Sequence, residues 1–268
     1  MTVGRIVAVV GFVLVGGWIW LRHPLGDAAG DLLPALAAFP LYIWLSRPWR
    51  WREKSGALSM PAVGVAVGFI FLGLAIDHTL LLALGWVLAW RAWLSTQLTT
   101  HAAAVSWKPM VLLVMGFPWL ALEGQQIGWW FRYSGAWAAE NWFALLGLTV
   151  ERDGTFLTVQ GLPLAVDAAC SGLHALQSML VAGTVMAWLV LPGRRFWVGV
   201  VMLPLLAWSA NVLRILTLGV VGLSFGTEAA MGWFHDWGGW GVLMLMFVLC
   251  STAFRLLAGK SKSAGRTT

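Results

Sequence analysis

The feature that most constrains this chain is the recurrence of long apolar segments along it. Eight runs of mainly apolar residues, 14 to 28 residues long, are candidates for helices that cross a bilayer, which takes roughly 20 residues. These runs are 6–21, 32–45, 57–76, 79–94, 105–122, 173–191, 196–223 and 238–257. The third and fourth runs meet at Asp77-His78 and together are too long for one span, which indicates a tight helical hairpin. The predicted fold class is an all-α polytopic membrane protein with about eight transmembrane helices.

The composition supports a membrane environment. Apolar residues make up 60% of the chain, charged residues only 10%, and the mean hydropathy is +0.80. A soluble domain usually carries about 25% charged residues. This balance excludes a soluble enzyme, a disulfide-stapled secreted domain, a disordered tail and a nucleic-acid binder, and leaves the lipid bilayer as the surroundings of the protein.

The basic residues predict the orientation. If both termini are cytoplasmic, 13 of the 17 lysines and arginines lie on the cytoplasmic side. They are Arg5, Arg47, Arg50, Arg52, Lys54, Arg91, Lys108, Arg194, Arg195, Arg255, Lys260, Lys262 and Arg266. Arg22, Arg132 and Arg152 lie outside, and Arg214 lies inside a span. This asymmetry follows the positive-inside rule, so the net charge of +6 is an orientation signal and does not indicate a nucleic-acid partner.

We predict a single integral membrane domain over residues 1–268. It comprises five N-terminal spans (1–122), an extracytoplasmic loop (123–171), a three-span core (172–257) and a basic cytoplasmic tail (258–268). The first half of the loop is rich in aromatic residues, which favours a small helix at the outer membrane surface. In its second half, β-branched residues flank Asp153-Gly154, which predicts a β-hairpin. This hairpin either grips an extended peptide by strand addition or covers the helices as a lid.

The two cysteines differ in context. Cys250 lies near the cytoplasmic end of the last span, whereas Cys170 lies at the outer start of the sixth, so a disulfide between them is implausible. Small residues surround Cys170, and a helix N-terminus lowers the pKa of a thiol. Cys170 is therefore a candidate nucleophile, and the alternative is an ordinary interfacial cysteine.

Arg214 and His235 are predicted to lie near Cys170. Arg214 is inside the seventh span, where a charge indicates a functional site, although a structural or snorkelling arginine is the alternative. About 27 Å of helix rise separates it from Phe196, which places it near the outer interface, and Asn211 lies one turn below it. His235 is in the last outer loop, with His174 as a rival. The predicted topology brings the three residues to one side of the membrane at a similar depth. A thiolate, a cation and an imidazole are the groups that acyl transfer through a thioester requires.

At these residues the sequence resembles the exosortase/archaeosortase family of membrane cysteine transpeptidases. The shared motifs are Ala169-Cys170-Ser171-Gly172-Leu173, Asn211-Val212-Leu213-Arg214-Ile215 and Phe234-His235, in the family's order and in successive spans. The resemblance covers about residues 148–257. Many members carry a glutamate two residues before the cysteine, where this chain has Ala168 with Asp167 preceding it. That difference bears on subtype and substrate.

The resemblance implies a function. Cys170 would be the nucleophile, Arg214 the electrostatic stabiliser and His235 the acid/base, with Asn211, Ser171, Gly172 and Asp167 in support. The substrate would be a secreted protein with a C-terminal sorting tail made of a short motif, a transmembrane helix and a basic cluster. The enzyme would lie in the bacterial inner membrane with its active site at the extracytoplasmic face. No cofactor is implied, and the sequence contains no Cys-x-x-Cys or His-x-x-x-His metal motif.

Two other classes of function remain open. A transporter or flippase would use Arg214 and Asn211 to bind an anionic substrate near the bilayer midplane, and it predicts inverted repeats, of which the sequence shows none. A non-catalytic scaffold of envelope assembly would leave Cys170 incidental.

Overall fold

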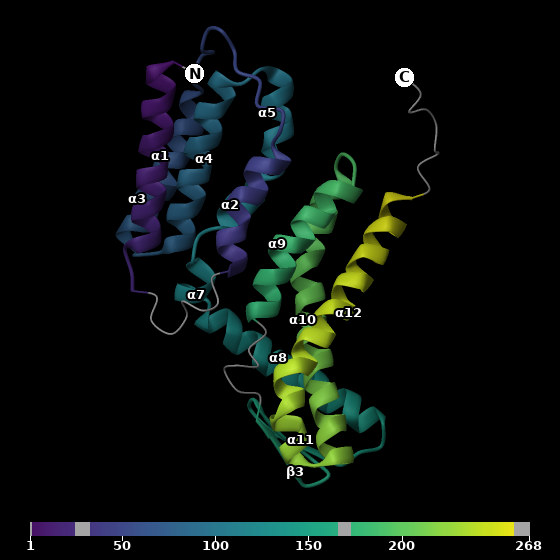
Figure 1. Cartoon of the computed structure of the whole chain (residues 1–268). Helices are drawn as coiled ribbons and strands as arrows, with labels where there is room; N and C mark the ends of the chain where they lie inside the picture. The colour runs from purple at the N-terminus through teal and green to yellow at the C-terminus, as the bar shows by residue number, and fades with distance from the viewer. Residues whose placement is uncertain (1, 25–32, 166–172, 260–268) are drawn as a thin grey trace. The chain divides into compact units, whose positions relative to one another are not determined.

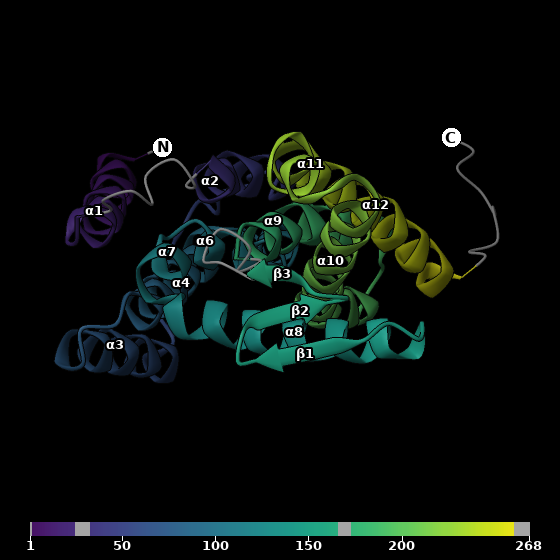
Figure 2. The same cartoon turned by 90° about the horizontal axis from the view of Figure 1, so that it is seen from below.

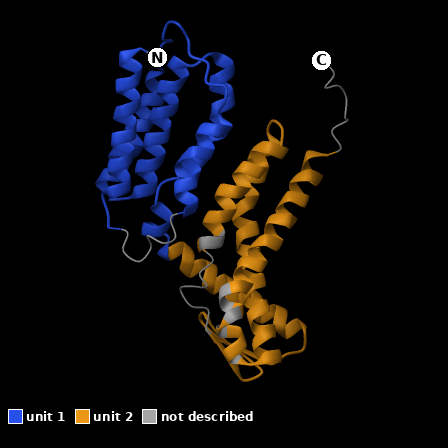
Figure 3. Ribbon diagram, in the orientation of Figure 1, with its two compact units in different colours: residues 1–125 blue, residues 126–268 orange. Residues whose placement is uncertain are grey.

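The computed structural model describes residues 2–24, 33–165 and 173–259. The chain forms two compact units, Met1–Gln125 and Gln126–Thr268, which Figure 3 distinguishes by colour. Four of the predicted site residues lie outside the described residues: Asp167, Cys170, Ser171 and Gly172. Each unit is considered by itself below.

The described part of the first unit consists of helices (Figure 1). They are α1 (Val3–Leu21), α2 (Leu33–Leu45), α3 (Met60–Ala75), α4 (Thr79–Gln97), α5 (Thr100–Trp107), α6 (Met110–Met115) and α7 (Trp119–Glu123). The first four coincide with the first four apolar runs. The fifth run differs from the prediction, because it is broken into short helices with Pro109 before α6 and Pro118 before α7. Proline lacks a backbone N–H and clashes with the preceding turn, which explains both breaks.

The predicted hairpin between the third and fourth runs is confirmed. Helices α3 and α4 are joined at Asp77 and pack closely because two glycines lie at their interface. A Cβ atom at Gly73 would lie 2.9 Å from the Leu82 side chain, and one at Gly85 would lie 2.9 Å from the Ala66 carbonyl oxygen. Neither position has room for a larger residue, so the approach of the two helices depends on glycine at both.

Polar contacts tie the ends of α1 to the ends of α4. At one end Arg22 forms an ion pair with Asp77, just before α4 begins. At the other end the Arg5 guanidinium donates to Gln97 Oε1 at 2.9 Å. Helices α1 and α4 are therefore antiparallel, and Arg5 and Arg22 lie at opposite ends of this unit, as the predicted alternation of spans requires.

The second unit combines helices with a small sheet. Its elements are α8 (Gln125–Leu145), β1 (Val150–Asp153), β2 (Phe156–Val159), β3 (Leu162–Ala165), α9 (Leu173–Val190), α10 (Arg195–Phe225), α11 (Thr227–Met231) and α12 (Trp233–Ala258). The helix predicted in this segment is confirmed as α8, which is longer than the small helix expected, and its place at the outer membrane surface stays a prediction. The predicted hairpin is confirmed as β1 and β2, and β3 extends it to a sheet of three strands.

The sheet is an antiparallel meander in the order β1-β2-β3. Asp153 pairs with Phe156, so the first loop has two residues and begins with Gly154 at φ +61°. The second loop consists of Gln160 and Gly161, with φ of 52° and 79°. Positive φ at both central residues is the signature of a type I′ turn, whose twist matches that of paired strands.

The sheet shares one hydrophobic core with α8 and the last third of α10. Phe143 of α8, Leu157 and Val159 of β2, and Ile215 and Leu218 of α10 are buried together. Figure 2 shows the sheet lying against these two helices. Helix α10 has 31 residues, about 46 Å of rise, which exceeds the roughly 30 Å hydrocarbon core of a bilayer. Its C-terminal part is therefore long enough to carry the sheet beyond the membrane.

Four described helices are long and apolar enough to cross a membrane. They are α1, α4, α10 and residues Trp237–Ala258 of α12. The apolar helices α2, α3 and Leu176–Val190 are shorter. Only 11% of the apolar stretch of α1 is buried inside the protein, so most of the apolar surface of this helix is available to lipid. The chain is a helical membrane protein, and the number of eight spans stays a prediction.

Candidate active site

Arg214 lies on α10 and faces α12. A Cβ atom at Gly239 of α12 would lie 3.3 Å from both Cζ and Nε of Arg214. The guanidinium therefore packs against the backbone of α12 at a position with no side chain, and it is half-buried. Placing this charge in an apolar helix is costly unless polar groups or a polar cavity surround it, which marks the position as a candidate functional site.

The register between α10 and α12 is set by two glycine contacts. At one, a Cβ atom at Gly199 of α10 would lie 3.3 Å from the Phe254 ring of α12; at the other, Arg214 meets Gly239. The two contacts are 15 residues apart on each helix. The helices therefore run antiparallel, and the pairing of residues between them keeps the same register from one contact to the other. Residue 235 precedes Gly239 by four positions and thus lies about one turn from the level of Arg214.

A third contact sets the level of α9. A Cβ atom at Gly183 would lie 2.2 Å from the Leu203 side chain of α10. Ten residues before Gly183 is Leu173, where α9 begins, and ten residues after Leu203 is Leu213. Because both helices rise 1.5 Å per residue, the start of α9 is level with the turn of α10 that carries Arg214. Cys170 precedes α9 by three residues in the sequence and lies outside the described residues.

The two candidate histidines are described only by their backbone. His174 lies in the first turn of α9, and His235 lies in the first turn of α12 rather than in the loop that the sequence suggested. Helix α12 begins earlier than the predicted span at residue 238, because the polar pair His235-Asp236 interrupts the apolar run without interrupting the helix.

Although Asn211 lies one turn below Arg214, no hydrogen bond joins the two side chains among the described residues. The Asn211 side chain is 1% exposed, and its Oδ1 and Nδ2 have no hydrogen-bond partner within the part of the chain that the structure describes. It faces α8, where a Cβ atom at Gly135 would lie 3.2 Å from Nδ2. A buried amide without partners typically costs 1–3 kcal/mol per unsatisfied group, so a polar partner at Asn211 would be stabilising.

The sheet is anchored on the same helix, beyond Arg214. A Cβ atom at Gly219 would lie 2.5 Å from the Phe143 ring of α8 and 3.1 Å from Leu164 of β3. On the outer side, Arg152 Nε donates to Glu140 Oε2 at 2.6 Å, and this hydrogen bond raises the pKa of the Arg152 guanidinium. The sheet is thus tied to both α8 and α10, and β3 leads directly into the segment that contains Cys170.

No group of three or more histidine, cysteine or acidic side chains that could hold a metal ion occurs among the described residues. Cys250 is fully buried in α12 among apolar residues, and it is a free thiol. Such burial is typical of a cysteine that acts as a small hydrophobic side chain.

Comparison with known families gives a match. Residues 6–252, nearly the whole chain, match the family of transmembrane exosortases. The chain belongs to the exosortase family. This match extends through the first unit, where the sequence showed only hydrophobic segments. Membership supports a general role as a membrane transpeptidase or protease of the cysteine type. None of the curated proteins and none of the solved structures matches the chain.

Two residues of this exosortase that contact the candidate site side chains were missed in the sequence. Gly239 lacks a side chain and so allows the Arg214 guanidinium to pack against α12, and Gly135 in the same way allows α8 to pack against Asn211. For Gly239 a signal exists, because it follows His235 by four residues and so lies on the same face of a helix. For Gly135 no pattern in the sequence indicates which helix it would meet.

Proposed function

We propose that this exosortase cleaves the C-terminal sorting tail of secreted proteins and transfers the new C-terminus through a thioester on Cys170. The observation that carries the proposal is the register between α9, α10 and α12 described above. It supports a similar depth along the helices for the start of α9, for Arg214 and, within about one turn, for the start of α12. Arg214 and His235 of the family motifs lie in two of these segments, and Cys170 precedes the start of α9 by three residues in the sequence.

In the first step the Cys170 thiolate attacks the carbonyl carbon of the scissile peptide bond. Negative charge develops on the carbonyl oxygen, and the Arg214 guanidinium stabilises it. The C–N bond then breaks, and the leaving amine takes a proton from the His235 imidazolium. The products are a thioester on Cys170 and the released tail with a free amino terminus.

In the second step an amine or a water molecule attacks the thioester. His235, now neutral, accepts the proton of this nucleophile, and the Cys170 thiolate leaves. An amine acceptor gives a new amide bond, and water gives a free carboxylate. Both outcomes return the enzyme to its starting protonation state, so no cofactor is needed for the cycle.

The sheet and Asn211 are proposed to hold the substrate. An extended sorting motif would add to the free edge of β3, which precedes the Cys170 segment, while the outward edge of β1 is the alternative. The buried amide of Asn211 offers one donor group and one acceptor for a substrate backbone. The hydrophobic tail of the substrate would lie in the bilayer beside the helices, with its basic cluster on the cytoplasmic side.

We place the enzyme in the bacterial inner membrane with both termini in the cytoplasm and the site outside. The excess of basic residues at predicted cytoplasmic loops supports this orientation, and the exposed apolar helices support the membrane environment.

A reporter assay tests the proposal. The reporter is a secreted protein of the same cells whose C-terminus carries a short motif, a transmembrane helix and a basic cluster. Co-expressed with the full-length enzyme, it should be shortened by the mass of the tail, and part of it should be bound to the enzyme by a link that neutral hydroxylamine cleaves, as thioesters are. A reporter without the motif is the control. A reporter that stays full-length with the wild-type enzyme would contradict the proposed function.

Gly239→Ala should slow processing without unfolding the protein. The added Cβ would lie 3.3 Å from the Arg214 guanidinium and displace it by a few tenths of an ångström. Because a misplacement of about 1 Å can lower a rate by about 100-fold, this smaller shift should lower the processing rate by up to about tenfold. Processing rates of the reporter measure the effect.

Gly241→Ala is the matched control, because a Cβ atom there meets nothing within 4 Å. Both substitutions raise helix propensity by about 1 kcal/mol, so both variants should be at least as resistant to thermal unfolding as the wild type. Equal processing rates in the two variants would show that Gly239 does not position Arg214.

A further inference from the structure

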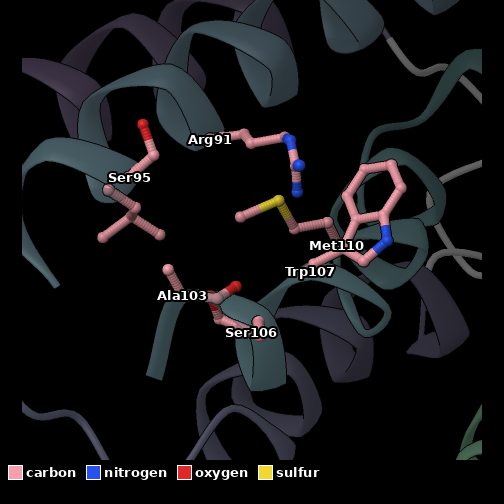
Figure 4. A pocket seen from close by; sticks show the side chains of 8 residues that line it. Arg91, Ser95, Ala103, Ser106, Trp107 and Met110 are labelled. Carbon is pink, nitrogen blue, oxygen red and sulfur yellow. The ribbon is translucent and has the colours of Figure 1, made fainter. Parts of the chain in front are cut away.

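The first unit contains a cavity between the end of α4 and helices α5 and α6. Its volume is about 290 Å³, and Figure 4 shows the side chains around it. Ser95 and Trp107 are exposed, so the cavity opens to the surface of the unit. It is formed by residues 91–110 alone and is separate from the candidate active site, which lies in the second unit. A cavity of this size accommodates a small polar group with a short apolar attachment.

The cavity is lined by a cation that has no carboxylate partner in the described part of the chain. Arg91 lies in α4, and its guanidinium stacks on the Trp107 ring, with Cζ 3.7 Å from the ring centroid. Within the described ranges no carboxylate forms an ion pair with Arg91, and none of the residues lining the cavity is acidic. A guanidinium in an apolar helix is stabilised by an anion that it binds through two parallel N–H groups. The cavity therefore favours an anionic occupant.

The surroundings favour a lipid over a free anion. Arg91 lies six residues, about 9 Å, before the end of α4, and at this end Arg5 donates to Gln97 and Arg52 donates to Thr100. This end of the unit is basic and would lie at the level of lipid headgroups in the predicted topology. Leu94 and Met110 give the cavity an apolar wall that an inorganic anion does not need.

We propose that this cavity binds the phosphate group of an anionic phospholipid, with Arg91 as its partner. The Trp107 ring holds the guanidinium in place, and the glycerol and the first acyl carbons lie along Leu94 and Met110. A zwitterionic headgroup fits less well, because the lining provides no carboxylate for its ammonium group. The site is independent of the peptide chemistry proposed above.

Lipid binding to the purified full-length protein tests the proposal. In a neutral detergent, phosphatidylglycerol should raise the unfolding temperature of the wild type by about 5 °C at 100 times its Kd. Phosphatidylcholine and inorganic phosphate should have little effect. In Arg91→Gln the affinity for phosphatidylglycerol, measured by native mass spectrometry, should fall at least about tenfold.

Two further variants complete the test. Arg194→Gln removes an exposed arginine of the second unit and should keep the full response to phosphatidylglycerol. Ala104→Phe fills the cavity while leaving Arg91 in place, and it should lose the response even if Arg91→Gln does not fold. An unchanged response in Arg91→Gln or Ala104→Phe would overturn the proposal. An equal response to inorganic phosphate would reassign the cavity to a free anion, and an equal response to phosphatidylcholine would exclude headgroup selection.

Discussion

Cys170→Ala should reduce processing of a tailed reporter to the level seen without the enzyme. The thioester cannot form without the thiol, and removal of a catalytic nucleophile typically lowers turnover by at least about 10³-fold. Two results should appear together in an immunoblot of the reporter: the shortened product disappears, and so does the hydroxylamine-sensitive adduct. Cys170→Ser should also be inactive or nearly so, because a hydroxyl group is a much weaker nucleophile than a thiolate.

Cys250→Ala is the matched control for this result. Cys250 is the other cysteine of the chain, and it is buried in α12 among apolar residues. Its replacement removes one sulfur atom from the core and should leave the processing rate within about twofold of the wild type. A membrane-impermeant maleimide added to intact cells should label the wild type and Cys250→Ala but not Cys170→Ala. Full function in Cys170→Ala would instead favour a transporter or a scaffold.

Arg214→Met should lower the rate of processing by about 10²- to 10³-fold, the usual effect of removing one group that stabilises a developing oxyanion. Methionine fills a similar volume and tolerates the apolar helix, so the fold should be retained. Arg214→Lys should recover part of the rate, since a lysine keeps the charge but cannot reproduce the planar guanidinium against Gly239. Single-turnover rates of reporter cleavage measure both effects.

The labelling rate of Cys170 separates two roles of Arg214. If Arg214 stabilises only the oxyanion, maleimide should react with Cys170 equally fast in wild type and Arg214→Met. If it also lowers the pKa of the thiol, the reaction should be slower in the variant. Arg194→Gln, at the opposite end of α10, is the control and should leave both rates unchanged. Wild-type cleavage by Arg214→Met would remove Arg214 from the mechanism.

Local patterns in the sequence were sufficient to predict most of the long helices and the β-hairpin. Apolar runs place α1, α2, α3, α4, α9 and α10 within a few residues, because a helix in lipid needs an uninterrupted apolar surface. The hairpin at Asp153-Gly154 was equally predictable from its turn residues. The fifth run was misread as one helix, although Pro109 and Pro118 were visible in it. Hydropathy averages over a window and therefore conceals such breaks.

The strand β3 was also missed, for a different reason. Pro163 lies in its centre, and proline is rare in strands. It is tolerated here because β3 is an edge strand of the sheet, where an N–H on the outward side needs no partner. Position within a sheet depends on which strands pair, and the local sequence does not contain that information.

The sequence alone determined that this chain is a helical membrane protein, the order of its motifs, and the approximate depth of Arg214 along its helix. Only the tertiary structure decided which helices meet and in what register. Contacts at Gly183, Gly199 and Gly239 align three helices so that the start of α9 and the Arg214 turn share one level, with residue 235 about one turn away. The physical reason is that a rise of 1.5 Å per residue sets depth within one helix, whereas the lateral neighbour of a glycine depends on side chains that are distant in the sequence.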